Sequence, residues 1–179
     1  MLNGIRLVCE AAELAARCHN GMARKGRDNE PYINHLAEVA KLLAAATDGT
    51  DAELVAAGWL HDAVEDGATT AEELTQKFSE RVASLVVEVT DDMTLPKSER
   101  RLRQVVDAPH KTPDARSIKI ADKISNIRAR IFPKQTAEQR EDLRDYTNWA
   151  AAVVAGCRGG NAFLDNTFDE AVAQARSTL

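Results

Sequence analysis

The spacing of apolar residues constrains the fold of this 179-residue chain more than any other feature. Ile118, Ala121, Ile124 and Ile127 recur at every third position, a spacing that predicts a helix through this segment. Aromatic residues make up only 4% of the chain, alanine is abundant, and few segments alternate between apolar and polar residues as strands do. We therefore expect an all-α fold, a helical bundle. The expected helices span about residues 5–18, 35–46, 51–64, 79–89, 97–106, 116–130 and 136–155, with a last one that ends near residue 176.

Capping residues predict where several of these helices begin. Asn34 is expected to cap the helix that starts at the next residue, and Asp51 is expected to cap the helix that continues to about Val64. Thr69-Thr70 followed by Glu72-Glu73 predicts a further short helix, because a threonine hydroxyl and a glutamate three positions later can cap each other's main-chain N–H groups.

The charge balance excludes some classes of partner. With 23 Lys and Arg against 28 Asp and Glu, the net charge is −5, which argues against general nucleic-acid binding. Basic residues still gather locally, where they could bind a small anion or simply form solvated helix faces. These clusters are Arg24-Lys25-Gly26-Arg27, then Lys97, Arg100, Arg101 and Arg103, then Lys119, Lys123, Arg128 and Arg130. No apolar run is long enough to span a membrane, and the N-terminus does not read as a signal peptide, so no membrane partner is expected.

The cysteines indicate the compartment. Cys9, Cys18 and Cys157 are scattered, odd in number and form no Cys-x-x-Cys pair. Such cysteines are typical of buried free thiols in a reducing cytosol, so a cytoplasmic protein is expected. No internal repeat, low-complexity tract or obvious linker interrupts the sequence, and we expect one domain over residues 1–179.

Four ionisable residues lie within six positions, at His61, Asp62, Glu65 and Asp66. If the predicted helix continues through them, His61 shares a face with Glu65 and Asp62 shares one with Asp66, because residues four apart are neighbours on a helix. Imidazole and carboxylate ligands without thiolate suit Mn, Fe or Zn, and so many ionisable groups are costly to bury without a cation. A hydrogen-bonded His-Asp pair or a solvated helix end would also account for the pattern.

Other polar residues are less informative alone. Asp122 and Asn126 repeat the one-turn spacing on another predicted helix. His35 and His19, each taken alone, are expected to be ordinary core or surface histidines, and no role is assigned to His110.

Several motifs taken in order resemble a known family. They are Arg24-Lys25, Pro31-Tyr32-Ile33-Asn34-His35, Leu60-His61-Asp62-Ala63-Val64-Glu65-Asp66, Val89-Thr90-Asp91-Asp92, Leu95-Pro96-Lys97 and Lys119-Ile120-Ala121-Asp122-Lys123-Ile124-Ser125-Asn126. This set resembles the HD-domain metal-dependent phosphohydrolases, and more closely the hydrolase domain of Rel/SpoT proteins. The resemblance is strongest to the free-standing small alarmone hydrolases, a group that includes the animal SpoT homologue.

The resemblance implies a fold and an activity. The fold is a single HD-domain helical bundle around a metal site. The substrate is a small guanine nucleotide, guanosine tetra- or pentaphosphate (ppGpp or pppGpp), from which the enzyme releases pyrophosphate at the 3′ position and so ends the stringent response. An HD phosphatase acting on NADPH or another phosphorylated nucleotide is the alternative enzyme, and a nucleotide sensor without activity is a third interpretation. The oligomeric state is not predicted.

The resemblance also implies roles for individual residues. One Mn²⁺, with Zn²⁺ or Fe²⁺ as substitutes, is expected on His35, His61, Asp62 and Asp122. The catalytic residues are Glu65 and Asp66, which handle the attacking water, and Asn126, which lies at the ribose. The substrate-binding residues are Arg24, Lys25, Tyr32, Lys97 and Tyr146. Three places depart from the family pattern: Gly21-Met22-Ala23 stands where Gly-Gln is frequent, Leu36 where proline is frequent, and Ser125 where a larger side chain is common.

Overall fold

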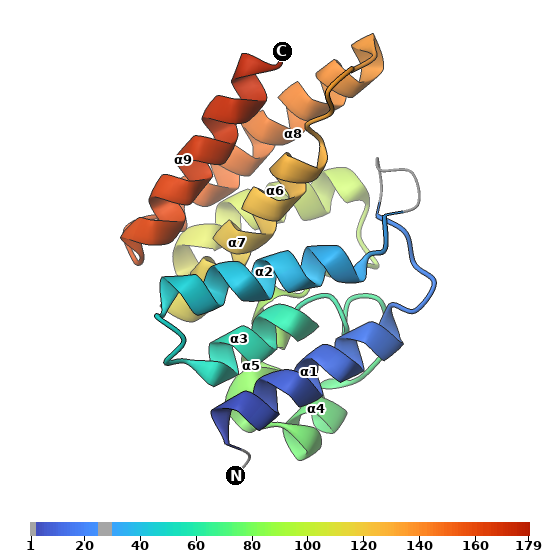
Figure 1. Ribbon diagram of the computed structural model, residues 1–179, viewed down its shortest axis with the longest axis vertical. Coiled ribbons are helices and arrows are strands. Elements are labelled where there is room, and N and C mark those ends of the chain that lie inside the picture. Colours follow the sequence, from blue (N-terminus) through green and yellow to red (C-terminus); the bar gives the residue numbers. More distant parts are fainter. Residues whose placement is uncertain (1–2, 25–29) are drawn as a thin grey trace.

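Helices form the framework of the computed structural model, which describes residues 3–24 and 30–179 (Figure 1). They are α1 (Gly4–Cys18), α2 (Ile33–Ala46), α3 (Ala52–Leu60), α4 (Ala71–Lys77), α5 (Glu80–Val89), α6 (Lys97–Asp107), a 3₁₀ turn (Ala108–His110), α7 (Pro113–Ala129), α8 (Ala137–Ala155) and α9 (Ala162–Ser177). The all-α prediction is confirmed. None of the described helices is long and apolar enough to cross a membrane.

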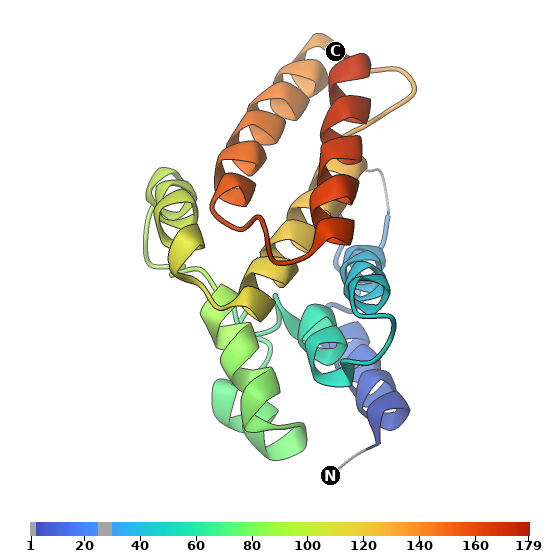
Figure 2. The same cartoon turned by 90° about the vertical axis from the view of Figure 1, so that its left-hand side faces the viewer.

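Helix α7 runs through the middle of the molecule. Helices α1 to α5 lie toward the end that holds the N-terminus, and the α8–α9 hairpin lies toward the other end (Figures 1 and 2). Helix α7 packs against α2, α3, α5, α8 and α9, and its residues Ile118, Ala121, Ile124 and Ile127 are fully buried. Polar residues of α7 are buried as well, so its neighbours enclose it on several sides.

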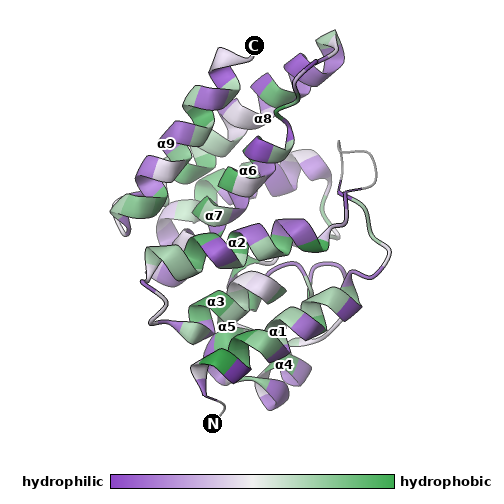
Figure 3. Ribbon diagram, in the orientation of Figure 1, coloured by the Kyte–Doolittle hydropathy of each residue, from purple (hydrophilic) through white to green (hydrophobic). Residues whose placement is uncertain are grey.

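The outer helices are amphipathic, and apolar and polar stretches alternate along them (Figure 3). Helix α1 is an example: it buries Leu7, Ala11 and Ala15, each one helical turn after the last, and packs on α3. Burial of one such face supplies most of the stability of a helix of this length in water.

Helices α2 and α3 approach each other closely at Gly58. A β-carbon at this position would lie 2.5 Å from Cδ1 of Leu43 and 3.5 Å from Cα of Ala40, both on α2. Leu43 is fully buried, and a close-packed interior leaves it no room to move aside. Glycine at this position therefore allows the two helices to pack at the distance observed.

The predicted start of α2 is wrong. The helix begins at Ile33, with Tyr32 rather than Asn34 at the N-cap position and no capping side chain. The main-chain N–H groups of Asn34 and His35 donate to the carbonyls of Pro31 and Tyr32 at 3.1 and 2.9 Å. These turn bonds carry the chain directly into the helix, so no cap at Asn34 is needed.

The predicted end of the next helix is also wrong, because α3 stops at Leu60 and does not reach Val64. Nδ1 of His61 donates to the main-chain oxygen of Gly58 at 2.9 Å. In a continued α-helix that oxygen would accept from the N–H of Asp62. The four ionisable residues therefore lie on consecutive turns after α3 and not on two faces of a helix.

Candidate active site

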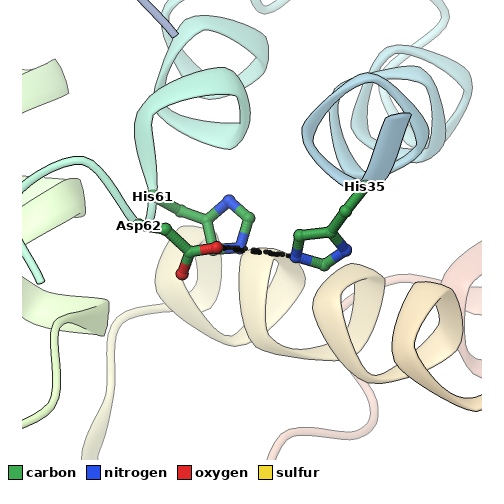
Figure 4. Close-up of side chains that lie close together, drawn as sticks. All are labelled: His35, His61 and Asp62. Carbon is green, nitrogen blue, oxygen red and sulfur yellow. Dashed lines mark hydrogen bonds and ion pairs between the residues drawn. The ribbon is translucent and has the colours of Figure 1, made fainter. Parts of the chain in front are cut away.

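Helix α2 and the turn after α3 bring three residues with metal-binding side chains together. Nε2 of His35 lies 3.3 Å from Nε2 of His61 and 3.6 Å from Oδ2 of Asp62, and Nε2 of His61 lies 3.3 Å from the same oxygen. Figure 4 shows the two rings and the carboxylate pointing toward one another beside a neighbouring helix. One ligand atom of each residue lies within 4.8 Å of the others, close enough to share an ion.

Asp122, on α7, faces the same group. Its Oδ1 lies 3.4 Å from Nε2 of His35 and 3.9 Å from Nε2 of His61. The same oxygen accepts a hydrogen bond from Nδ2 of Asn126, one turn later, and Oδ2 accepts one from Nζ of the buried Lys123 at 2.7 Å. The one-turn spacing thus places the amide of Asn126 against the carboxylate of Asp122, and this contact fixes the orientation of the carboxylate.

These residues fit a single divalent cation. Because Nδ1 of His61 donates to Gly58, its Nε2 presents a lone pair toward His35 and toward the carboxylates of Asp62 and Asp122. Converging lone pairs of nitrogen and carboxylate oxygen repel one another unless a positive charge lies between them. A donor set of imidazole and carboxylate without thiolate suits Mn, Fe or Zn.

Both carboxylates are held in the ionised form. Burial raises the pKa of Asp62, but the His61 ring and the Tyr32 hydroxyl, which donates to Oδ2 at 2.5 Å, help to hold it well below its ordinary value. Burial likewise raises the pKa of Asp122, but the ammonium of Lys123 and the charges of His35 and His61 together outweigh it, and the pKa is lowered to about 2. Ionised carboxylates are the forms that bind a metal.

Glu65 lies in the cleft beside this group. Its Oε2 accepts a hydrogen bond from the main-chain N–H of Asp91 at 3.0 Å. Burial raises its pKa, and although that hydrogen bond opposes the shift, the negative charge of Asp62 adds to it. A carboxylate with a raised pKa that is fixed at one oxygen and lines a cleft has the properties of a general base.

Asp66 is partnered by a histidine to which the sequence assigned no role. Nε2 of His19 lies 3.3 Å from Oδ2 of Asp66, and its Nδ1 bonds the main-chain oxygen of Ala15 at 2.8 Å. The His19 ring is buried and stacks on Tyr32, with the ring centroids 5.2 Å apart. No local motif signals this pairing, because it depends on how the end of α1 meets the turn after α3.

A cleft of about 280 Å³ adjoins the candidate metal ligands. Its cationic lining comes from α6, α7 and the residue that caps α7, and consists of Lys97, Arg100, Arg101, Lys119, Lys123 and Arg130. Tyr146 and Trp149 of α8 add two aromatic rings, and the guanidinium groups of Arg130 and Arg101 lie 3.7 and 4.8 Å from their respective centroids. Cations and aromatic faces beside a metal-type site suit a phosphorylated nucleotide.

The residues predicted to bind substrate fall in three different places. Two tyrosines and a lysine line the cleft, as does the predicted catalytic amide: Tyr32, Tyr146, Lys97 and Asn126. Arg24 is buried instead, and its guanidinium lies behind His35, against Ser125. Lys25 lies outside the described residues. Contacts between these side chains and a substrate stay predictions.

Known proteins resemble this chain in sequence and in fold. A family model described as "HD domain" matches residues 11–156. The chain is 42% identical over 172 residues to "Guanosine-3′,5′-bis(diphosphate) 3′-pyrophosphohydrolase MESH1" of Homo sapiens, covering 95% of each protein. It is 42% identical over 171 residues to the protein of the same name from Xenopus tropicalis, covering 94% of each.

A solved structure reported as "A metazoan ortholog of SpoT hydrolyzes ppGpp and plays a role in starvation responses" has a similar fold, with a TM-score of 0.85 and 36% identity over 97% of both chains. HD domains are metal-dependent, in agreement with the cluster around His35 and His61. The family match includes all four candidate ligands and spans most of the chain. This chain therefore belongs to the HD-domain family, in the group that contains the MESH1 proteins.

Proposed function

We propose that this chain hydrolyses guanosine tetra- and pentaphosphate at the 3′ position, giving GDP or GTP and pyrophosphate and so ending a stringent response. The main support is the convergence of His35, His61, Asp62 and Asp122 beside a cleft with a cationic lining. The names of the relatives, which specify this reaction, support the choice of substrate. A single domain over residues 1–179 would contain the whole activity. The three free cysteines agree with a cytoplasmic location.

One divalent ion is part of the proposal, with Mn²⁺ as the native metal and Zn²⁺ or Fe²⁺ as substitutes. When bound, the ion lowers the pKa of water and neutralises charge on the 3′-phosphate. Its protein ligands are His35, His61, Asp62 and Asp122. The hydrogen bonds from Asn126 and Lys123 hold the Asp122 carboxylate toward the two imidazoles.

Glu65 is the general base in this reaction. It accepts a proton from the attacking water while the new bond to phosphorus forms and the bond from phosphorus to the 3′ oxygen breaks. The 3′ oxygen leaves as a hydroxyl after it takes up a proton. Asp66 assists by orienting the water, and its pKa is raised by burial and then by the charge of Asp62.

The cleft lining positions the substrate. Phosphoryl transfer depends on positioning and on charge neutralisation more than on covalent catalysis, which explains why an acidic protein gathers cations here. We assign Lys97 and Arg130 to the phosphates and the ring of Tyr146 to the nucleoside. Asn126, which lines the cleft beside Asp122, is assigned to the ribose.

Turnover of ppGpp by purified protein tests the proposal. The protein is stripped of metal, half of it is refilled with Mn²⁺, and the products are separated by anion exchange. GDP and pyrophosphate that appear only in the refilled sample would support both the reaction and the cofactor class. His61→Ala and Asp62→Ala should lose metal and activity together.

No cleavage of ppGpp at full metal occupancy would contradict the proposal. NADPH and other phosphorylated nucleotides would then be tested in the same assay. Release of phosphate from NADPH alone would instead establish the alternative HD phosphatase.

A further inference from the structure

A buried hydroxyl lies directly behind His35, the candidate metal ligand on α2. Oγ of Ser125, on α7, is completely buried and lies 3.0 Å from Nδ1 of His35, 2.7 Å from Nη2 of Arg24 and 2.6 Å from Oε2 of Glu38. Arg24 also donates to the main-chain oxygen of Ser125 at 2.7 Å, and Arg128 donates to Oε1 of Glu38 at 3.1 Å. We call Arg24, Glu38, Ser125 and Arg128 the His35 support network.

The hydrogen-bonding capacity of the serine fixes the direction of each bond. A hydroxyl has one hydrogen to donate and two lone pairs to accept with, whereas a guanidinium only donates and an ionised carboxylate only accepts. Ser125 therefore donates to Glu38 and accepts from Arg24. The remaining lone pair faces Nδ1 of His35 at 3.0 Å. Nη2 of Arg24 lies farther from that nitrogen, at 3.4 Å, and its two hydrogens go to the two oxygens of Ser125 at 2.7 Å, so Nδ1 of His35 carries the hydrogen.

Glu38 decides this direction because it is ionised. Burial raises its pKa, but the hydrogen bonds from Ser125 and Arg128 and the nearby charge of Arg24 outweigh burial and lower the pKa below its ordinary value. If Ser125 instead donated to His35, one of its lone pairs would face the carboxylate at 2.6 Å, which is repulsive.

The two histidines of the metal group are held by different means. His61 donates from Nδ1 to the main-chain oxygen of Gly58, which every side-chain substitution leaves in place. His35 depends on the side chains of Ser125 and Glu38, which substitutions can remove singly. His61 is thus an internal reference for any effect on His35.

We infer that the His35 support network positions a metal ligand: it holds the imidazole with its hydrogen on Nδ1 and the Nε2 lone pair toward the metal site. Glu38, Ser125 and Arg24 act on the ion only through this ring. The inference rests on the metal site of the proposed function and is independent of the substrate. Groups that orient a ligating histidine typically change metal affinity about 10- to 100-fold when they are removed.

The inference changes the expected role of Arg24. Its Nη2 is occupied by the main-chain and side-chain oxygens of Ser125, and the residue is only 7% exposed. Arg24→Ala should therefore weaken Mn²⁺ binding when no nucleotide is present. An arginine that only contacts the nucleotide would leave that affinity unchanged and raise KM instead.

The first test is Mn²⁺ affinity, measured by isothermal titration calorimetry on metal-free protein without nucleotide. Ser125→Ala removes one hydroxyl and suits a helix, so the fold should persist, and the Kd should rise about 10- to 100-fold. Ser117→Ala is the matched control: it is the same change on the same helix, but its hydroxyl bonds the oxygen of Pro113 at 3.0 Å, so its Kd should equal that of the wild type. Equal Kd values for the two variants would overturn the inference.

The second test reads the hydrogen position directly. Correlation NMR of the imidazole nitrogens in metal-free protein identifies which nitrogen of His35 is protonated. We expect Nδ1–H in the wild type. In Glu38→Ala the serine hydroxyl is released to donate to the ring, so the Nε2–H tautomer should increase while His61 stays unchanged. A wild-type His35 protonated on Nε2 would overturn the inference.

Neither test involves turnover. If both tests give the expected results but ppGpp is not cleaved, the proposed substrate is contradicted and this inference stands.

Discussion

Replacing Glu65 with glutamine should remove most of the turnover and leave the metal and the local structure in place. Glu65 accepts from the N–H of Asp91, whereas Asp62 and Asp122 lie against Nε2 of His35, so the ion should stay bound without the carboxylate of Glu65. The amide oxygen of glutamine can still accept from the N–H of Asp91, the bond that fixes Oε2 at 3.0 Å. What the variant lacks is a group that can take a proton.

The expected loss follows from that single function. A positioned general base contributes about 10²- to 10⁴-fold to the rate. At about 1.36 kcal/mol per factor of ten, this corresponds to roughly 2.7–5.4 kcal/mol of transition-state stabilisation. Burial raises the pKa of Glu65 toward the working pH, where a general base is most effective. We therefore expect kcat to fall by an amount in the upper half of the 10²- to 10⁴-fold range. KM should change little, since the bond to Asp91 is retained.

The assay is steady-state hydrolysis of ppGpp as a function of pH, with bound Mn²⁺ measured on the same samples. Glu65 must be ionised to accept a proton, so kcat/KM should fall as the pH drops through its pKa, which lies above the ordinary value of 4.5. This acid limb should be absent in Glu65→Gln. A variant with full metal content and kcat close to the wild type would refute the assignment, and parallel loss of metal would show that Glu65 is a ligand.

Three further predictions concern other parts of the structure. In His19→Gln the side-chain nitrogen can still face Asp66, whereas in His19→Asn it can reach only the carbonyl of Ala15 on α1. The kcat for ppGpp should therefore be about tenfold lower in the asparagine variant than in the glutamine variant. Equal kcat values would exclude a role of His19 in positioning Asp66. Asp51→Asn keeps the N-cap of α3 but loses the ion pair with Arg81. In the wild type, the hydrogen bond from Arg81 lowers the pKa of Asp51 below 3.8. In urea unfolding, the wild type should therefore be more stable than this variant above pH 3.8, and the difference should vanish as the pH falls through the lowered pKa. Ile124→Ala should reduce the free energy of unfolding by about 2–5 kcal/mol in the same assay, and a smaller loss would mean that the core around α7 relaxes into the cavity.

Local signals in the sequence were sufficient for most of the helices. Thr70 and Glu73 form the reciprocal cap that their spacing predicts, and the side chain of Asp51 caps α3. The apolar residues at every third position predicted the helix that the structure shows as α7. Each of these features depends on residues within one or two turns of each other.

The sequence was insufficient where a distant partner decides the outcome. The position of Arg24 depends on Glu38 and Ser125, which lie on α2 and α7. The end of α3 is a local exception, because it coincides with the bond from His61 to Gly58, three residues earlier, which apolar spacing does not signal. The resemblance assigns Arg24 to substrate binding, which stays a prediction; in the structure its guanidinium is buried behind the imidazole of His35. Contacts between elements far apart in the chain leave no periodic or capping signal, so the sequence alone could not predict them.

The contact at Gly58 has a consequence for the choice of ion. Helix α2 carries His35, and α3 leads directly into His61, so the separation of these helices sets the gap between the two Nε2 atoms. Mg²⁺, Mn²⁺ and Ca²⁺ differ in preferred ligand distance by only a few tenths of an ångström. A methyl group added at Gly58 would lie 2.5 Å from Cδ1 of Leu43, closer than an ordinary contact, so the buried leucine or the two helices would have to move apart. Selectivity among ions of different radius is therefore open to evolution through substitutions in the apolar interior that never touch the metal.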